Sequence, residues 1–103
     1  MALFAFTSAT LAEASPVQTP AGFITSLHGG WVNANLRVKT DFAWNNPENC
    51  SYTDGYMVDA ADPGHELFSS MLISAFMSGK RIQLVLDGCA HERPRIISVE
   101  LVQ

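Results

Sequence analysis

Charged side chains are scarce in this chain of 103 residues: Asp, Glu, Lys and Arg together make up 16% of it. Soluble domains ordinarily contain about 25% of these residues. The hydrophobic fraction is 48%. This composition has two interpretations. Either part of the surface is covered by a partner subunit or a ligand, or the protein is a compact and mildly acidic globule. The formal net charge is −4, and no more than two basic residues are adjacent. A nucleic-acid-binding protein carries a basic patch instead, so we expect no nucleic-acid partner.

Long hydrophobic runs are also missing, because no segment reaches the roughly 20 apolar residues that span a bilayer. We therefore expect no membrane span. Residues 2–14 are nevertheless small and apolar, and Ala12-Glu13-Ala14 has the form of a signal-peptidase site. Although a basic start is absent, residues 1–14 are interpreted as a signal-peptide-like segment; the alternative is an ordinary N-terminal helix. Residues 15–20 would then be a loosely ordered tail, and residues 21–103 the folded domain of a periplasmic or secreted protein.

Cysteine is limited to two residues, Cys50 and Cys89. In an exported protein an even number of cysteines favours a disulfide, and closing a loop of about 40 residues would stabilise the fold by about 4 kcal/mol. The alternative is a pair of unpaired core thiols in a cytosolic protein. The two cysteines do not form a C-x-x-C motif, so they do not indicate a metal or redox site.

Catalytic motifs are absent from the sequence. It has no phosphate-binding loop, no G-x-G-x-x-G and no G-x-S-x-G. Three aspartates within residues 54–62 lack the calcium-loop register and are interpreted as turn and cap residues. The histidines have no metal-ligand spacing and are expected at the surface; they are His28, His65 and His91. We expect no metal site, no cofactor and no enzymatic activity.

Hydrophobic periodicity is what the sequence does contain. Residues 32–41 alternate apolar and polar side chains with a period of two, which predicts a strand with one buried face. A β-rich run over residues 22–28 precedes it, and His28-Gly29-Gly30 predicts the turn of a hairpin. Residues 52–60 are a third strand candidate. Further alternation over 82–87, and at Ile97, Val99 and Leu101, predicts two more strands.

Between the third and fourth strands the period changes to that of a helix. Asp62 as N-cap and Pro63 at the first helical position predict its start, and Gly79 predicts its end, giving residues 63–78. The expected core stripe is Phe68, Met71, Leu72, Ala75 and Phe76. The order β-β-β-α-β-β, mainly β with one helix, predicts a five-stranded barrel of the OB-fold type. The alternative is a split sheet with the helix on one face.

The helix has no charged residue from Leu67 to Gly79. A lone helix facing solvent usually carries Lys and Glu, so this neutral face favours contact with another subunit; the alternative is burial under the chain's own long loop. The expected homo-oligomer interface consists of Ser69, Ser70, Ile73 and Met77.

The loop after the second strand is rich in aromatic and amide side chains. Aromatic rings stack on sugar rings, while amides form hydrogen bonds with hydroxyl groups. A ligand-binding site is therefore predicted, although the aromatics could instead only cover one end of the barrel. The predicted residues are Trp44, Asn45, Asn46, Tyr52 and Tyr56.

Residues 70–97 carry a resemblance. A helix ending in Ser78-Gly79-Lys80 leads into the strand 82–87, then Gly88-Cys89, then Pro94 and the last strand. This pattern resembles small exported bacterial proteins and the B (binding) subunits of subtilase-type and pertussis-like toxins. The resemblance implies an OB fold, a pentameric ring with the helices lining a central pore, and binding of sialylated glycans. The serine that contacts sugar in that family has no equivalent here, since its position falls near Pro20 and Ala21.

Together these observations predict an exported, non-catalytic module that binds a glycan or another ligand as a ring-forming oligomer. The alternative is a periplasmic or secreted protein that is structural, or that binds another protein through the helix face or an open strand edge.

Overall fold

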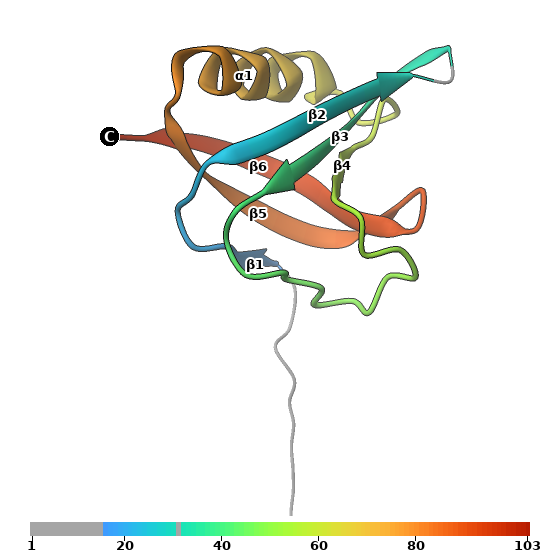
Figure 1. Cartoon of the computed structure of the whole chain (residues 1–103). Helices are drawn as coiled ribbons and strands as arrows, with labels where there is room; N and C mark the ends of the chain where they lie inside the picture. The colour runs from blue at the N-terminus through green and yellow to red at the C-terminus, as the bar shows by residue number, and fades with distance from the viewer. Residues whose placement is uncertain (1–15, 31) are drawn as a thin grey trace, which may run out of the picture.

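The computed structural model describes residues 16–30 and 32–103, so the segment interpreted as a signal peptide lies outside the described residues. The described part forms six strands and one helix (Figure 1). The elements are β1 (Val17–Gln18), β2 (Ile24–Gly30), β3 (Asn33–Thr40), β4 (Tyr56–Val58), α1 (His65–Ser78), β5 (Arg81–Ala90) and β6 (Arg93–Val102). The prediction of a mainly β chain with one helix is confirmed, whereas the predicted number of five strands is wrong.

All six strands form one sheet in the order β1-β5-β6-β4-β3-β2. Neighbouring strands are antiparallel except for β4 and β6, which pair in parallel with Met57 opposite Arg95. Val38 of β3 and Leu84 of β5 belong to one core although two strands separate them in the sheet. The sheet therefore curls, and α1 covers the core where it packs chiefly against β6 and β2 (Figure 1).

The additional strand, β1, falls in the segment that was expected to be a loose tail. Val17 pairs with Leu86, and the Thr19 backbone N–H donates to the Leu84 carbonyl at 2.8 Å. Thr19 is only 2% exposed, and its hydroxyl accepts a hydrogen bond from the Leu84 N–H at 3.0 Å. Gly22 then bridges to Ile82 before the chain continues into β2. One segment, residues 17–30, thus pairs with β5 at its start and with β3 at its end.

The helix follows its prediction closely except at its first turn. It ends as expected, with Gly79 in the left-handed conformation at φ 69°. Its N-cap, however, is Gly64 and not Asp62. The Asp62 carboxylate instead accepts hydrogen bonds from Arg95 Nη1 at 3.0 Å, so it is not available to cap the helix. Leu72 and Ala75 are fully buried, but Phe76, expected in the core, is 41% exposed.

The last strand differs from the predicted alternation at a bulge. Ser98 pairs with Val85, whereas Ile96, and not Ile97, pairs with the next residue of β5. The extra residue changes which side chain faces the core. Ile96 is consequently fully buried, while Ile97, one of the expected core positions, is only partly buried.

The β2–β3 hairpin projects beyond the rest of the sheet (Figure 1). The turn predicted at residues 28–30 lies further along, because Gly30 still pairs with Asn33. Val32, at the tip, is fully exposed and has φ 66°. A β-branched residue in the left-handed region is strained, because its Cβ approaches the following carbonyl oxygen.

Relieving this strain should stabilise the protein. We expect Val32→Asn to raise the free energy of unfolding by about 1 kcal/mol, because asparagine tolerates the left-handed conformation. Chemical denaturation measures the change. Val32→Thr is the matched control, since it adds polarity but keeps the branched Cβ. An equal gain from both variants would mean that polarity, and not backbone strain, is responsible.

Candidate functional site

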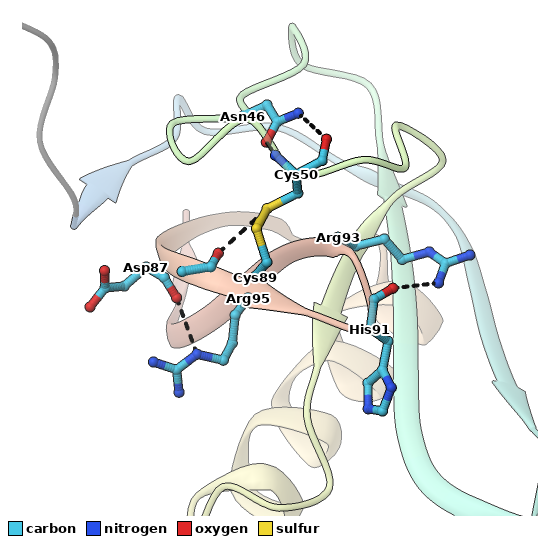
Figure 2. The surroundings of a disulfide bond; sticks show 8 residues. Asn46, Cys50, Asp87, Cys89, His91, Arg93 and Arg95 are labelled. Carbon is cyan, nitrogen blue, oxygen red and sulfur yellow. Dashed lines mark hydrogen bonds between the residues drawn. A yellow bond between two sulfur atoms is a disulfide. The ribbon is translucent and has the colours of Figure 1, made fainter.

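A disulfide joins the long connection between β3 and β4 to the far end of β5. Cys50 and Cys89 are bonded, with their Cα atoms 5.8 Å apart, which confirms the predicted bridge (Figure 2). The Tyr52 N–H also donates to the Glu92 carbonyl at 2.8 Å. Covalent bond and hydrogen bond together hold residues 50–55 against the β5–β6 hairpin.

The two asparagines predicted to bind a ligand hold this connection in place. The Asn46 side chain accepts from the Cys50 N–H at 2.7 Å and donates to the Cys50 carbonyl at 2.9 Å (Figure 2). Asn45 Nδ2 donates to the Ala43 carbonyl at 2.8 Å. Both ends of the Asn46 amide thus bond the backbone of their own loop, whereas Asn45 uses only its NH₂ group there.

The predicted aromatic residues separate into two places. Trp44 stacks on Tyr56 with ring centroids 4.8 Å apart, and Phe42 packs on the same tyrosine at 5.9 Å. Tyr56 is 1% exposed, and its hydroxyl accepts from the Asn45 N–H at 2.9 Å. Burial raises the pKa of this phenol. Tyr56 is therefore the support for Trp44, which is 39% exposed.

Tyr52 lies apart from Trp44 and Tyr56 and contacts Arg93 instead. It is 48% exposed, and the Arg93 guanidinium sits 4.7 Å from the centre of its ring. Such a cation–π contact at an exposed position contributes about 0.5–1 kcal/mol. The structure thus brings Trp44 and Tyr56 together and places Tyr52 beside the β5–β6 hairpin.

An ionic cluster that the sequence did not reveal joins these two places. Asp54 accepts from Arg93 Nε at 2.7 Å and Nη2 at 3.0 Å, and from Arg37 Nη1 at 2.9 Å. The hydrogen bond from Arg93 is the main cause that lowers the pKa of Asp54, against a smaller opposing effect of burial. The same bond raises the pKa of Arg93. Two guanidinium groups on one carboxylate leave the cluster with a net charge of +1.

The lowered pKa of Asp54 predicts a loss of stability in acid. A carboxyl group whose folded pKa is depressed contributes stability above its unfolded value, 3.8, and loses it as the pH falls through the lower folded value. Asp54→Asn should abolish this part of the acid dependence. At neutral pH it should cost about 1 kcal/mol or less, because the exposed side chain is screened by solvent.

Urea unfolding of both proteins at neutral and acidic pH measures this difference. Asp87→Asn is the matched control, because it removes the same charge and the Asp87 carboxylate forms no ion pair with another described residue. An Asp54 variant with the parent's full acid dependence would show that other carboxyl groups control it.

The first cleft, here called the Trp44 cleft, has a volume of about 290 Å³. The exposed indole of Trp44, the partly buried Phe42 and the buried Tyr56 form its aromatic wall. Its polar lining is Thr25, Lys39, Thr40, Thr53 and Asp54. Aromatic surface and hydroxyl groups are thus combined in one concave site.

The second cleft, here called the hairpin cleft, has a volume of about 330 Å³ and lies between the two hairpins. Met57 contributes its apolar part. The polar lining is His28 of β2, Asn33, Asn35 and Arg37 of β3, His91 of the β5–β6 turn and Arg93 of β6.

Both clefts follow the outer face of β3. Alternate residues of a strand point to the same side, so Asn33, Asn35, Arg37 and Lys39 share that face while Leu36 and Val38 face the core. The sequence did predict this alternation. It could not show that the face becomes two clefts, because Asp54 and the β5–β6 hairpin, which complete them, are remote in sequence.

The neutral face of α1 is exposed at three of the four residues that were predicted to form an interface. Ile73 is 48% and Met77 77% exposed, and Ser70 is also exposed, whereas Ser69 is partly buried. Leu67, 62% exposed, and Phe76 extend the apolar surface. No loop within residues 16–30 and 32–103 covers this face.

Residues 16–30 and 32–103 contain no group of three or more His, Cys, Asp or Glu side chains that could hold a metal ion. Within the same residues no helix has the length and hydropathy needed to cross a bilayer. The candidate sites in these residues are the two clefts and the exposed face of α1. Comparison with protein-family models, with curated proteins and with solved structures finds no match for this chain.

Proposed function

We propose that this protein is an exported, non-catalytic module that binds a glycan or a similar polar ligand in the Trp44 cleft. The observation that carries the proposal is the exposed indole of Trp44, held by stacking on Tyr56 and surrounded by hydroxyl side chains. A sugar ring offers an apolar face for the indole and hydroxyl groups for Thr25, Thr40 and Thr53.

We further propose that the sheet is a barrel of the OB type. Three features support this: the parallel pairing of β4 and β6, the helix between β4 and β5, and the segment 17–30 that pairs with both β5 and β3. The face of the second and third barrel strands is where OB folds bind oligosaccharides. In the proposed barrel these strands are β3 and β4, which contribute residues to both clefts.

Export to the periplasm or the medium fits the disulfide, since such bonds persist in oxidising compartments. Assembly into a ring, a pentamer if the resemblance to toxin B subunits holds, fits the uncovered apolar face of α1. The same face equally supports the alternative, a structural or interaction protein that binds a different protein there.

A glycan array probed with the purified chain tests ligand binding. We expect binding to at least one oligosaccharide, and Trp44→Ala to weaken it about tenfold or more, because stacking on the ring is lost. Phe23→Ala is the matched control, since Phe23 is 44% exposed and lines neither cleft. Silence of the array, or equal binding by Trp44→Ala, would exclude the Trp44 cleft as a sugar site.

Light scattering of the chain, compared with the double variant Ile73→Lys and Met77→Lys, tests assembly. We expect an oligomer that the two lysines dissociate into monomers. Both positions are exposed, so the substitutions should leave the fold intact. A monomeric parent protein would argue against a ring and favour the alternative of a heterologous protein partner.

A further inference from the structure

We infer that the hairpin cleft is a second, separate binding site, which takes the anionic group of a small polar molecule: a carboxylate or a sulfate or phosphate ester. This goes beyond the proposed glycan site and does not depend on it. The cleft retains hydrogen-bonding groups that the protein's own bonds do not use.

The asparagines of the cleft offer mainly donors. Asn35 Oδ1 accepts from the Ala60 N–H at 2.7 Å, and Asn33 Oδ1 accepts from the Asn35 N–H at 3.4 Å. Each carbonyl oxygen already has one backbone partner and keeps at most one further lone pair for a ligand. The NH₂ group of each side chain can donate two hydrogen bonds and cannot accept one.

Arg37 adds the charge. It gives Asp54 a single hydrogen bond, through Nη1, whereas Arg93 gives Asp54 two and uses its third nitrogen on the His91 carbonyl (Figure 2). Each of the three nitrogens of Arg93 therefore has a hydrogen-bond partner, whereas Arg37 donates only through Nη1. The buried Nε of Arg37 has no hydrogen-bond partner among the described residues. An incompletely bonded guanidinium in a cleft is a position where an added acceptor gains free energy.

No carboxylate of the described part of the chain lines this cleft. Its titratable residues are all bases, two arginines and two histidines, of which His91 is 3.6 Å from Asp59 and His28 is exposed. With the net charge of +1 on the arginine–aspartate cluster and amide donors beside it, the cleft is complementary to an anion rich in acceptor oxygens. At about 330 Å³ it has room for a sugar-sized carrier of that anion.

The test is an NMR titration of the full chain at low ionic strength. The probes are glucuronate, glucose 6-sulfate and glucose 6-phosphate, with glucose as the neutral control. We expect at least one anion to shift the backbone signals of residues 28–37 and 91–93, and glucose to leave them unchanged. The three anions distinguish the kind of group that binds. A response to glucuronate alone indicates a site for a planar carboxylate. A response to the two esters indicates a site for a tetrahedral oxyanion.

Asn35→Asp is the decisive variant. It keeps the oxygen that accepts from the Ala60 N–H but replaces the donor NH₂ with a negative oxygen, so the fold is retained and the anion is repelled. Binding should weaken about tenfold or more, as loss of a charge-assisted bond predicts. Arg37→Gln should act in the same direction, and Lys80→Gln, an equal loss of charge at the exposed end of the helix, should not.

Trp44→Ala should leave the response to the anion intact, so that failure of the glycan proposal and failure of this inference remain distinguishable. Three results would overturn the inference: no shift with any of the three anions, equal shifts with glucose, or parental affinity in Asn35→Asp.

Discussion

Replacing Cys50 and Cys89 with serine should lower the free energy of unfolding by about 4 kcal/mol. The disulfide spans 39 residues, and the chain-entropy model assigns about this value to a loop of that length. Small domains are stable by about 5–15 kcal/mol in total, so the variant should lose a large fraction of its stability. The midpoint of thermal unfolding should fall by roughly 20 °C.

Calorimetry of the parent and the double variant, with a thiol count on both samples, measures this effect. The free thiol count of the unfolded parent should be zero. Tyr52 adds a local readout, because its amide is bonded to the Glu92 carbonyl beside the bridge and should exchange faster in the variant. A loss of less than about 1 kcal/mol would mean that the unfolded chain is already compact without the bridge.

The second large effect concerns the contact of α1 with the core. Leu72 is fully buried and belongs to the core cluster. Leu72→Ala should destabilise the protein by about 3 kcal/mol, through the lost transfer free energy and the cavity left behind. Leu67→Ala is the matched control: it is the same change on the same helix at a side chain that is 62% exposed.

Urea unfolding of the two leucine variants should separate them by about 2 kcal/mol or more. If Leu67→Ala were equally destabilising in a concentrated sample but not in a dilute one, Leu67 would be buried by a second copy of the chain. Similar and concentration-independent losses would contradict the placement of α1.

The features that could be predicted from the sequence are those with a local pattern. The alternation around Leu36 and Val38 predicted β3, and the change of period predicted α1 together with its end at Gly79. The disulfide was predictable because the chain has only two cysteines. In each case a few neighbouring residues, or a count, carry the signal.

The N-terminal strand shows why other features were missed. Two residues, Val17 and Gln18, become β1 only because they meet β5, nearly seventy positions away along the chain. The capping role expected for Asp62 was also wrong because of a contact remote in sequence. Its carboxylate accepts hydrogen bonds from Arg95 of β6. The bulge at Ile97 also depends on pairing with β5, which the alternation of one strand does not contain.

The candidate site shows the same division. Aromatic and amide residues in one loop indicated binding, but the fold uses Asn45 and Asn46 for the backbone and buries Tyr56 beneath Trp44. The hairpin cleft had no signal of its own, because Arg37 and Arg93 meet at Asp54 only after the sheet has curled.

By itself, the sequence determined the helix and most strands, the covalent bridge, and the neutral face of α1, because periodicity and composition act over one element at a time. Only the tertiary structure decided which polar side chains form hydrogen bonds with the protein's own backbone and which remain available to a ligand. That distinction depends on hydrogen bonds and ion pairs between residues remote in sequence, whose partners exist only once the sheet has formed.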